Sequence, residues 1–252
     1  MNITLCFDRL DPAPWVKGLQ VALPQAQVSA WAPGAPQADH AIVWAPPQQF
    51  IDEQPGLQAM FNIGAGVDAL LQLKLPPSLK VVRLDDAGMS VQMAEYVCHA
   101  VIRHFREFDG YDADTRAGKW SYRKPRSRAD FSVGVMGLGV LGERVAKALQ
   151  VFDFPVNGYS RSPKQIEGVR SFSGASQFHD FLQSSRILVN LMPLTPETEN
   201  MLNKESLSRL QAGGYLINVA RGKHLVDEDL LALIDSGHLA GATLDVFRTE
   251  PL

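Results

Sequence analysis

The sequence predicts an α/β protein with two domains, each a parallel sheet with helices on both faces, and a ligand cleft between them. Three observations support this prediction: the chain has 252 residues, apolar runs of strand length alternate with segments of helical spacing, and a glycine-rich turn joins one such strand to one such helix. At about 100–200 residues per domain, the length corresponds to two domains. We expect these at residues 1–95 and 96–252.

The first half of the chain shows the alternation in short units. We expect strands at 2–7, 41–44 and 58–63 and helices at 66–73 and 90–108. In the last of these helices, apolar residues recur at steps of four, as at Met93, Val97 and Val101, which places them on one face. We expect the domain boundary inside this helix.

A polar segment, 109–130, separates the two halves and has no sustained apolar period, so we expect an irregular connecting arm. Its part 116–128 holds six cations with Trp120 and Tyr122 between them. Such a stretch can bind nucleic acid, but a solvated arm is the simpler interpretation.

After the arm, strand and helix patterns alternate regularly. We expect strands at 131–136, 156–159, 187–192, 215–219 and 242–247, and helices at 143–152, 204–210 and 228–235. Strands that alternate with helices form parallel sheets with right-handed crossovers.

Composition and charge argue against several classes of function. The net charge is −3, so the chain lacks the cationic field that attracts nucleic acid. The N-terminal apolar run is interrupted by Asp8 and Arg9 and is too short for a signal peptide or a membrane span, so we expect a cytoplasmic protein with no membrane partner. Cys6 and Cys98 match no metal or disulfide spacing, and we expect both to be buried and no metal to be bound.

A glycine pattern, GLGVLG, follows one expected strand and opens one expected helix, and this context predicts a dinucleotide-binding turn of the Rossmann type. Gly137 allows the tight turn, Gly139 lets the backbone approach a pyrophosphate, and Gly142 allows close packing of helix and strand. We expect the cofactor to be bound by Gly137, Leu138, Gly139, Val140, Leu141 and Gly142. The alternative is a glycine-rich turn without a ligand.

The end of the next strand distinguishes NADPH from NADH. An Asp or Glu about 20 positions after the glycine turn would hydrogen-bond the ribose 2′-hydroxyl of NAD. Here the chain has Ser160, Arg161 and Ser162, followed by Lys164, and these hydroxyls and cations suit a 2′-phosphate. We therefore expect NADPH to be preferred, with NADH possible. The alternative is that Arg161 is an ordinary solvated loop cation.

From residue 133 onward the chain resembles the D-isomer-specific 2-hydroxyacid dehydrogenases, and within them the branch that reduces glyoxylate and hydroxypyruvate. Besides the glycine turn, the shared motifs of this part are LVNLMPLTPET at 188–198, NVARG at 218–222 and GATLDVFRTEPL at 241–252. The first half of the chain adds NIGAGVD at 62–68 and MAEYV at 93–97. The resemblance implies a flavodoxin-like substrate domain before the Rossmann domain. It also implies hydride transfer from NADPH to small 2-keto acids, giving glycolate or glycerate, by a homodimer.

The resemblance also implies roles for individual residues. Arg221 corresponds to the catalytic arginine and Glu250 to the acid that partners a catalytic histidine; alternatively, Arg221 only caps its strand and Glu250 is a surface acid. A planar guanidinium can hold the adjacent carboxylate and carbonyl oxygens of a 2-keto acid together. The substrate is expected to contact Arg221 and the backbone N–H groups of Ala65 and Gly66. Trp44 either belongs to the core of the first domain or faces the substrate. Further cofactor contacts are expected from Met93, Met192, Pro193, Thr198, Val219, Ala220 and Asp245.

The family's general-acid histidine follows the acid by some tens of residues, whereas this sequence ends at Leu252. All six histidines precede Glu250, and His224, the nearest to Arg221, is interpreted as an ordinary residue of a strand-to-helix connection. We expect the sequence to be a fragment of a longer active enzyme, with a shortened homologue that has lost catalysis as the alternative. Two other functions stay open: an NAD-linked D-2-hydroxyacid dehydrogenase, and a dinucleotide-sensing partner protein without turnover.

Overall fold

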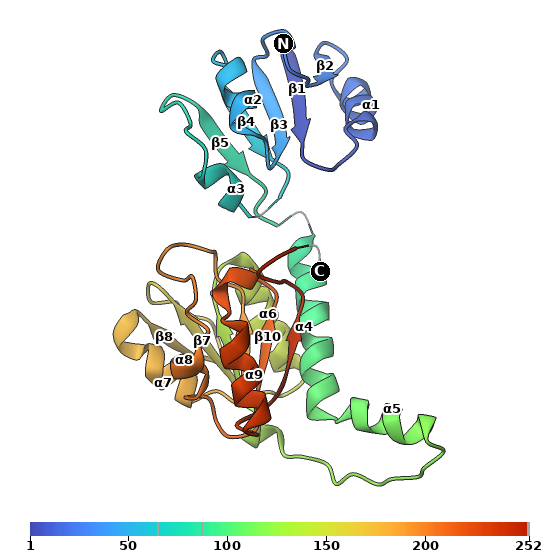
Figure 1. Ribbon diagram of the computed structural model, residues 1–252, viewed down its shortest axis with the longest axis vertical. Helices are drawn as coiled ribbons and strands as arrows, with labels where there is room; N and C mark the ends of the chain where they lie inside the picture. Colours follow the sequence, from blue (N-terminus) through green and yellow to red (C-terminus); the bar gives the residue numbers. More distant parts are fainter. Residues whose placement is uncertain (65, 87, 251–252) are drawn as a thin grey trace. The chain divides into compact units, whose positions relative to one another are not determined.

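The structure is a computed structural model that describes residues 1–64, 66–86 and 88–250. It divides into two compact units, Met1–Ala87 and Gly88–Leu252 (Figure 1). Each unit contains one sheet whose strand pairs all run parallel, which confirms the predicted fold class.

The division falls just before helix α4 (Met89–Phe105), whereas the expected boundary at residue 95 lies inside that helix. The reason is packing. Ala94, Val97 and Val101 of α4 are buried in the same apolar cluster as residues of helix α6, so the whole helix belongs to the second unit.

The first unit is a five-stranded sheet with the order β2-β1-β3-β4-β5, which is the flavodoxin-like arrangement. Its strands are β1 (Asn2–Phe7), β2 (Gln27–Ala30), β3 (His40–Trp44), β4 (Ala59–Asn62) and β5 (Lys80–Arg83). Its helices are α1 (Ala13–Ala22), α2 (Gln48–Glu53) and α3 (Asp68–Leu71). Strands β2 and β5 and helices α1 and α2 were not predicted from the sequence; α1 has no buried residue that would mark a face, and β5 is exposed along its whole length.

The second unit is a six-stranded sheet with the order β11-β10-β9-β6-β7-β8. Counted within the unit this is 3-2-1-4-5-6, the order of Rossmann dinucleotide-binding domains. Its strands are β6 (Val133–Met136), β7 (Val156–Ser160), β8 (Val169–Ser173), β9 (Ile187–Asn190), β10 (Gly214–Asn218) and β11 (Leu239–Leu244). The α-helices besides α4 are α5 (Phe108–Arg116), α6 (Val140–Val151), α7 (Phe178–Gln183), α8 (Lys204–Leu207) and α9 (Asp227–Asp235). Short 3-10 turns are η1 (Arg128–Asp130), η2 (Ala175–Gln177) and η3 (Gly222–His224).

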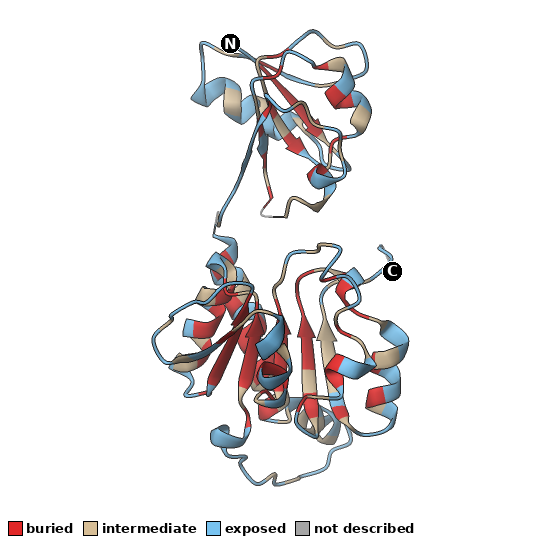
Figure 2. Cartoon of the chain, turned by 90° about the vertical axis from the view of Figure 1, so that its left-hand side faces the viewer, coloured by how far each residue is buried: buried red, intermediate tan, exposed pale blue. Residues whose placement is uncertain are grey.

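The sheet of the second unit is covered on both faces, and its buried strands are visible in Figure 2. Every residue of β6, β7 and β9 is buried. One apolar cluster joins the sheet to α4 and α6, and a second joins it to α7, α8 and α9. Because both faces are covered, β6 and β9 are mainly apolar rather than alternating between apolar and polar residues.

Several expected elements of the second unit have other bounds in the structure, and β8 and α7 were not expected. The last strand, expected at 242–247, is β11 and begins three residues earlier. The segment expected to be an irregular arm begins with a helix, α5. It was missed because its sequence is polar and its helical state depends on contacts with α4, where Arg103 binds Asp109 and Asp112.

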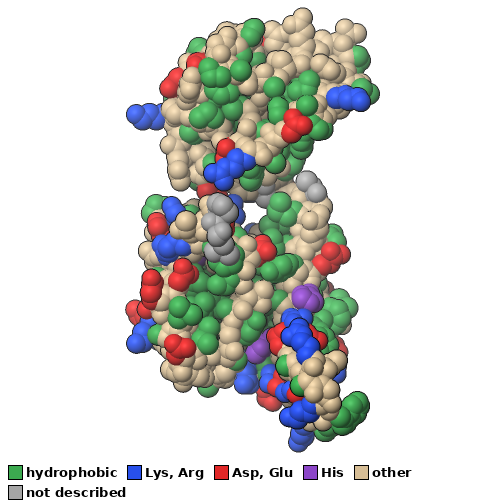
Figure 3. Space-filling model, turned by 45° about the vertical axis from the view of Figure 1, so that its right-hand side comes forward, with side chains coloured by type: hydrophobic (Ala, Val, Ile, Leu, Met, Phe, Trp, Pro, Cys, Tyr) green, Lys and Arg blue, Asp and Glu red, His purple; other side chains and the backbone are tan. Residues whose placement is uncertain are grey.

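The rest of the arm follows the expectation of a solvated segment. Trp120 and Tyr122 are 95% and 80% exposed. Lys and Arg side chains gather on it together with acidic ones (Figure 3).

Candidate active site

The candidate site lies at the carboxyl edge of the second unit's sheet, where β6 and β9 are neighbours. In this topology the connections leave β6 and β9 toward opposite faces, which opens a crevice between them. The glycine turn 137–142 follows β6, and the loop 191–198 follows β9. A backbone hydrogen bond connects the chain where these two segments begin: Leu191 N donates to Met136 O at 2.9 Å.

The three glycines of the turn have different surroundings. Gly137 has φ of 100°, in the left-handed region that favours glycine. A Cβ on Gly142 would lie 1.8 Å from the carbonyl oxygen of Gly137, so only glycine lets the helix approach the turn. A Cβ on Gly139 would meet nothing within 4 Å. The protein's own packing therefore requires Gly137 and Gly142, while the open space at Gly139 fits the close approach of a pyrophosphate.

Helix α6 presents its N-terminus to this space. It begins at Val140, and its N-cap residue Gly139 has no side chain to satisfy the first backbone N–H groups. Such a helix end favours a phosphate group. Glu143, the one acid of the first turn, is paired with Lys147 at 2.6 Å, which reduces its repulsion of an anion. The side chain of Leu138 is buried, so this residue offers only its backbone to a ligand.

The end of β7 carries the residues expected at a 2′-phosphate. The Ser160 hydroxyl donates to the carbonyl oxygen of Ser162 at 2.7 Å and closes a tight turn. Arg161, between them, is exposed. Its charge acts on the loop after β9: a hydrogen bond from Thr195 and, to a smaller extent, the Arg161 charge hold the pKa of Glu197 below its usual range.

The loop after β9 is held from within by a threonine. Thr198 is buried, and its hydroxyl donates to Pro193 O at 2.8 Å and accepts from Thr195 N at 2.8 Å. At the start of the loop, Met192 N donates to Asn190 Oδ1 at 3.2 Å. The backbone of Met192 and Pro193 is thereby fixed beside the carboxyl edge of the sheet.

A buried polar network that sequence reasoning missed lies beneath this edge. Asn190 ends β9, Asn218 ends β10, and His224 closes η3; all three are 0% exposed. Asn190 Nδ2 donates to Asn218 Oδ1 at 3.0 Å and lies 3.0 Å from His224 Nδ1. The sequence contained a signal, because each asparagine ends an apolar strand where a polar residue has no obvious packing role.

The network reaches the candidate catalytic arginine. Asn218 Nδ2 donates to Arg221 O at 3.1 Å, and His224 Nδ1 lies 3.1 Å from the same oxygen. The Arg221 side chain is partly buried, and its Nη1 donates to Ala220 O at 2.6 Å. Val219 and Ala220, which connect it to β10, are buried.

The segment with Glu250 packs on the arginine loop. A Cβ on Gly222 would lie 1.9 Å from the carbonyl carbon of Phe247, so the two backbones are in direct contact. Arg248 binds the carbonyl oxygen of Leu225 and the side chain of Asn200. Glu250 is exposed, and its Oε1 accepts from Phe247 N at 2.8 Å. The structure thus brings the backbone segments of Arg221 and Glu250 together.

Two further candidate cofactor residues belong to the same unit. Met93 on α4 is partly buried and packs on the core of the second unit. Asp245 is exposed after β11, and its backbone N donates to Asn218 O at 3.0 Å. Burial, together with the Asp245 charge, raises the pKa of Tyr96 on α4.

In the first unit, the expected substrate loop follows β4. Asn62 is buried and its Nδ2 donates to Gly64 O at 2.7 Å and to Gly66 O at 2.8 Å. Ala65 lies outside the described residues. Trp44 is 36% exposed, and a Cβ on Gly64 would lie 2.1 Å from its ring, so the interpretation of Trp44 as a core residue is wrong.

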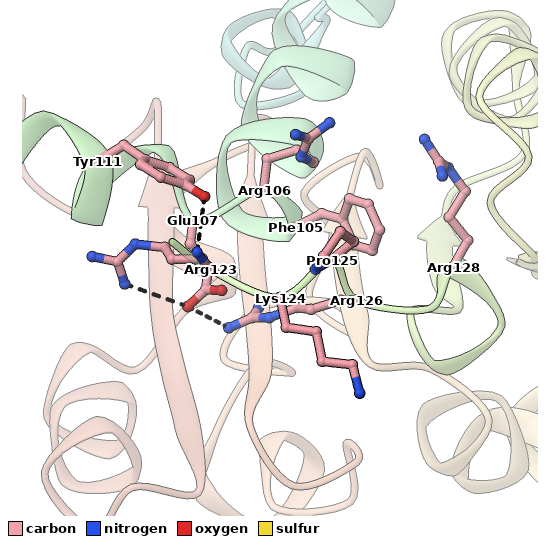
Figure 4. A pocket seen from close by; sticks show the side chains of 9 residues that line it. All are labelled: Phe105, Arg106, Glu107, Tyr111, Arg123, Lys124, Pro125, Arg126 and Arg128. Atoms are coloured by element: carbon pink, nitrogen blue, oxygen red, sulfur yellow. Dashed lines mark hydrogen bonds and ion pairs between the residues drawn. The ribbon is translucent and has the colours of Figure 1, made fainter. Parts of the chain in front are cut away.

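A small pocket at the base of the arm contains a cluster of ion pairs (Figure 4). Glu107 lies 2.9 Å from Arg126 and 4.0 Å from Arg123. Arg123 also binds Asp114 at 2.7 Å. Two of the pocket's cations, Arg123 and Arg126, are therefore already paired.

The remaining expectations concern membrane spans, metal ligands and cysteines within residues 1–64, 66–86 and 88–250. There, no helix has the length and apolar character to cross a bilayer, and no cluster of His, Cys, Asp and Glu has the size of a metal site. Cys6 and Cys98 are free and buried as predicted, and burial raises the pKa of Cys6 to about 12.

Similarity to known proteins was found over the whole chain. Residues 98–252 match the family model described as "D-isomer specific 2-hydroxyacid dehydrogenase, NAD binding domain". The chain is 46% identical to glyoxylate/hydroxypyruvate reductase A of Serratia proteamaculans, with 100% of this chain and 83% of that protein covered.

Solved structures agree. A D-isomer specific 2-hydroxyacid dehydrogenase from Xanthobacter autotrophicus Py2, in complex with NADPH and MES, superposes with a TM-score of 0.92 at 40% identity, covering 100% of this chain and 82% of that one. An NADPH-dependent glyoxylate/hydroxypyruvate reductase from Sinorhizobium meliloti, in complex with NADP and sulfate, has a TM-score of 0.90 at 34% identity with the same coverage.

Proposed function

This chain belongs to the D-isomer specific 2-hydroxyacid dehydrogenase family, and on this basis we propose that it reduces small 2-keto acids with NADPH. The substrates are glyoxylate, which becomes glycolate, and hydroxypyruvate, which becomes glycerate. The observation that carries the proposal is the open approach to Gly139 at the uncapped start of α6, with Arg161 in place of an acid at the end of the neighbouring strand.

The residues present fit the cofactor. The backbone of the turn 137–142 would bind the pyrophosphate, and Ser160, Arg161 and Ser162 the 2′-phosphate. When bound, NADPH supplies the hydride that reduces the substrate. Further contacts are proposed for Met93, Met192, Pro193, Thr198, Val219, Ala220 and Asp245.

In the proposed reaction, Arg221 holds the substrate and polarises it. Its guanidinium would pair with the carboxylate and the carbonyl oxygen, so that negative charge developing on that oxygen is stabilised. In the first unit, Trp44 and the backbone of Gly66 are proposed to contact the substrate. The carbonyl carbon gains a hydride and the oxygen a proton; the family resemblance makes Glu250 the partner of the histidine that donates this proton.

The test of the reaction is NADPH oxidation by the full-length protein with glyoxylate and with hydroxypyruvate, with NADH in parallel. We expect turnover with both keto acids and a preference for NADPH. Binding of NADPH without any turnover would favour the dinucleotide-sensing function instead. A preference for NADH with oxidation of D-2-hydroxy acids would favour the NAD-linked dehydrogenase.

The cofactor assignment is tested by Arg161→Ala. Loss of a charge-assisted contact with the 2′-phosphate should weaken NADPH binding by about ten- to a hundred-fold and leave NADH binding unchanged. Arg116→Ala, at an exposed arginine of α5, is the matched control and should change neither. Unchanged discrimination in Arg161→Ala contradicts the assignment.

We also propose that the enzyme acts in the cytoplasm as a homodimer. The family resemblance supports the dimer. Sedimentation velocity measures its mass directly, and a monomer at micromolar concentration would contradict it.

A further inference from the structure

The imidazole of His224 lies between two segments that the proposed function assigns to different ligands. Its Nδ1 is 3.1 Å from the carbonyl oxygen of Arg221, and its Nε2 is 3.2 Å from that of Pro193. Arg221 is assigned to the substrate, whereas Pro193 belongs to the loop that is assigned to the cofactor. One buried ring therefore connects the substrate side of the site with the cofactor side.

Each of these carbonyl oxygens has a second partner from nearby in the fold. Pro193 O accepts from the Thr198 hydroxyl at 2.8 Å, and Arg221 O accepts from Asn218 Nδ2 at 3.1 Å. Thr198 and Asn218 each hold one segment in its own conformation. A neutral imidazole carries one N–H. With this proton on Nε2, His224 donates to Pro193 O and its Nδ1 accepts from Asn190 Nδ2; Asn190 also donates to Asn218 Oδ1, and Asn218 donates to Arg221 O. The ring therefore relates the position of the Pro193 loop to that of the Arg221 backbone through the two asparagines.

The ring is itself held in place. Asn190 Nδ2 lies 3.0 Å from His224 Nδ1, and Asn190 also binds Asn218 and the backbone of Met192. Asn190, Asn218 and His224 are all 0% exposed, so water does not compete for these contacts. A buried ring with contacts on both nitrogens has one orientation, and a shift of either segment has to move it.

We propose that His224 is a positioning residue that couples the cofactor loop at Pro193 to the backbone of Arg221. NADPH bound against the loop then favours the arrangement of Arg221 that binds the keto acid. This inference rests on the proposed function, because that function assigns the two ligands to the two segments. His224 itself is assigned no contact with either ligand.

Two nearly isosteric substitutions of His224 test the contacts of its two ring nitrogens separately. In His224→Asn the amide lies near the position of Nδ1, which keeps an acceptor for Asn190 Nδ2 and removes the donor to Pro193 O. In His224→Gln the amide reaches toward the position of Nε2, which keeps a donor to Pro193 O and removes the acceptor for Asn190 Nδ2, through which the ring is connected to Asn218 and Arg221 O. Both variants remain polar, and their folding is checked by thermal unfolding.

The measurements are the NADPH dissociation constant from the quenching of protein fluorescence, and kcat and KM for glyoxylate. We expect His224→Asn to weaken NADPH binding about five- to tenfold, as for one lost hydrogen bond, with a smaller effect on KM. We expect His224→Gln to leave NADPH binding near that of the parent and to raise KM or lower kcat by a similar factor. His179→Asn, at an exposed histidine of α7, is the control and should change none of these constants.

A double-mutant cycle provides a second test. Thr198→Val removes the other hydrogen bond to Pro193 O, so its effect on NADPH binding should be larger in the His224→Asn background than in the parent. Additive effects, or equal losses of every constant in both His224 variants, would overturn the coupling and leave a structural role only. Failure of the proposed function is a separate result, because it shows as an unsubstituted protein that neither binds NADPH nor oxidises it.

Discussion

The two units have the same architecture but are covered to different degrees. In the second unit, β6, β7 and β9 are buried throughout and apolar clusters lie on both faces. In the first unit, α1 has no buried residue and every residue of β5 is exposed. Parallel sheets are stable when both faces are covered. We therefore expect the second unit to be the more stable one, and the first to depend more on what else it contacts.

Despite this difference, the carboxyl edges of the two sheets share one feature, a buried asparagine at the end of a strand. Asn62, Asn190 and Asn218 each end a strand, are buried, and hydrogen-bond backbone groups of the loop that follows. Asparagine is suited to this because its short amide reaches backbone groups two or more residues ahead. In all three cases the loop contains a residue that the proposed function assigns to a ligand.

The largest difference between the units is expected for the loss of a phenylalanine ring. Phe181 in the second unit is 0% exposed and packs on the rings of Tyr159 and Phe172, whereas Phe61 in the first unit is 41% exposed. Phe181→Ala should lower the free energy of unfolding by about 3–5 kcal/mol, and Phe61→Ala by about 1 kcal/mol or less.

Urea unfolding measures both effects. Circular dichroism follows both units, while tryptophan fluorescence follows mainly the first, because three of the four tryptophans precede residue 88. Equal losses in the two variants would show that the two sheets are equally well covered.

A smaller difference is expected at the two glycine loops. An alanine at Gly142 would meet the backbone of Gly137, which cannot move without displacing the turn, whereas one at Gly64 would meet the ring of Trp44. Gly142→Ala should therefore cost about 2–3 kcal/mol and abolish NADPH binding, and Gly64→Ala about 1 kcal/mol, with a raised KM for the keto acid as the ring shifts. Thermal unfolding and initial rates test this; a Gly142→Ala protein that binds NADPH normally would contradict it.

The smallest expected effect is a pH dependence of the stability of the second unit. His104 on α4 stacks on Tyr215 with ring centroids 4.1 Å apart. Burial, with the charges of Arg126 and Arg186, lowers the pKa of His104 to about 4 from 6.5. Between about pH 4 and pH 6.5, His104 is therefore protonated in the unfolded chain and neutral in the folded one. The stabilisation is complete above pH 6.5 and is lost as the pH falls from 6.5 to about 4.

The expected loss is about 1 kcal/mol, because partial exposure of the ring screens its charge. His104→Phe keeps the stacking and should flatten the stability profile between these pH values, while His99→Asn, at an exposed histidine of the same helix, should leave it unchanged. Urea unfolding at pH 7 and pH 4.5 compares them. A His104→Phe protein with the parent's pH dependence would assign the effect to another group.

Much of the fold was predictable because it depends on local pattern. The buried strands β6 and β9 are continuous apolar runs, and the glycine turn is specified by backbone sterics at Gly137 and Gly142. Short or polar elements were not predictable in this way. Helix α5 was missed because its polar sequence becomes helical where Arg103 and Arg123 bind its aspartates.

The candidate site also has parts that the sequence predicted and parts that it did not. The glycine turn with Gly139 and the Arg161 loop indicate an NADPH-type dinucleotide from the sequence alone, because that chemistry depends on residue types at local spacing. The 2-keto acid and the role of Arg221 came from the resemblance to a known family. The role of His224 was not predictable, since its partners Asn190 and Pro193 lie 34 and 31 residues away along the chain. A histidine becomes a buried connection only when folding brings such distant carbonyl and amide groups to its two nitrogens and excludes water from them.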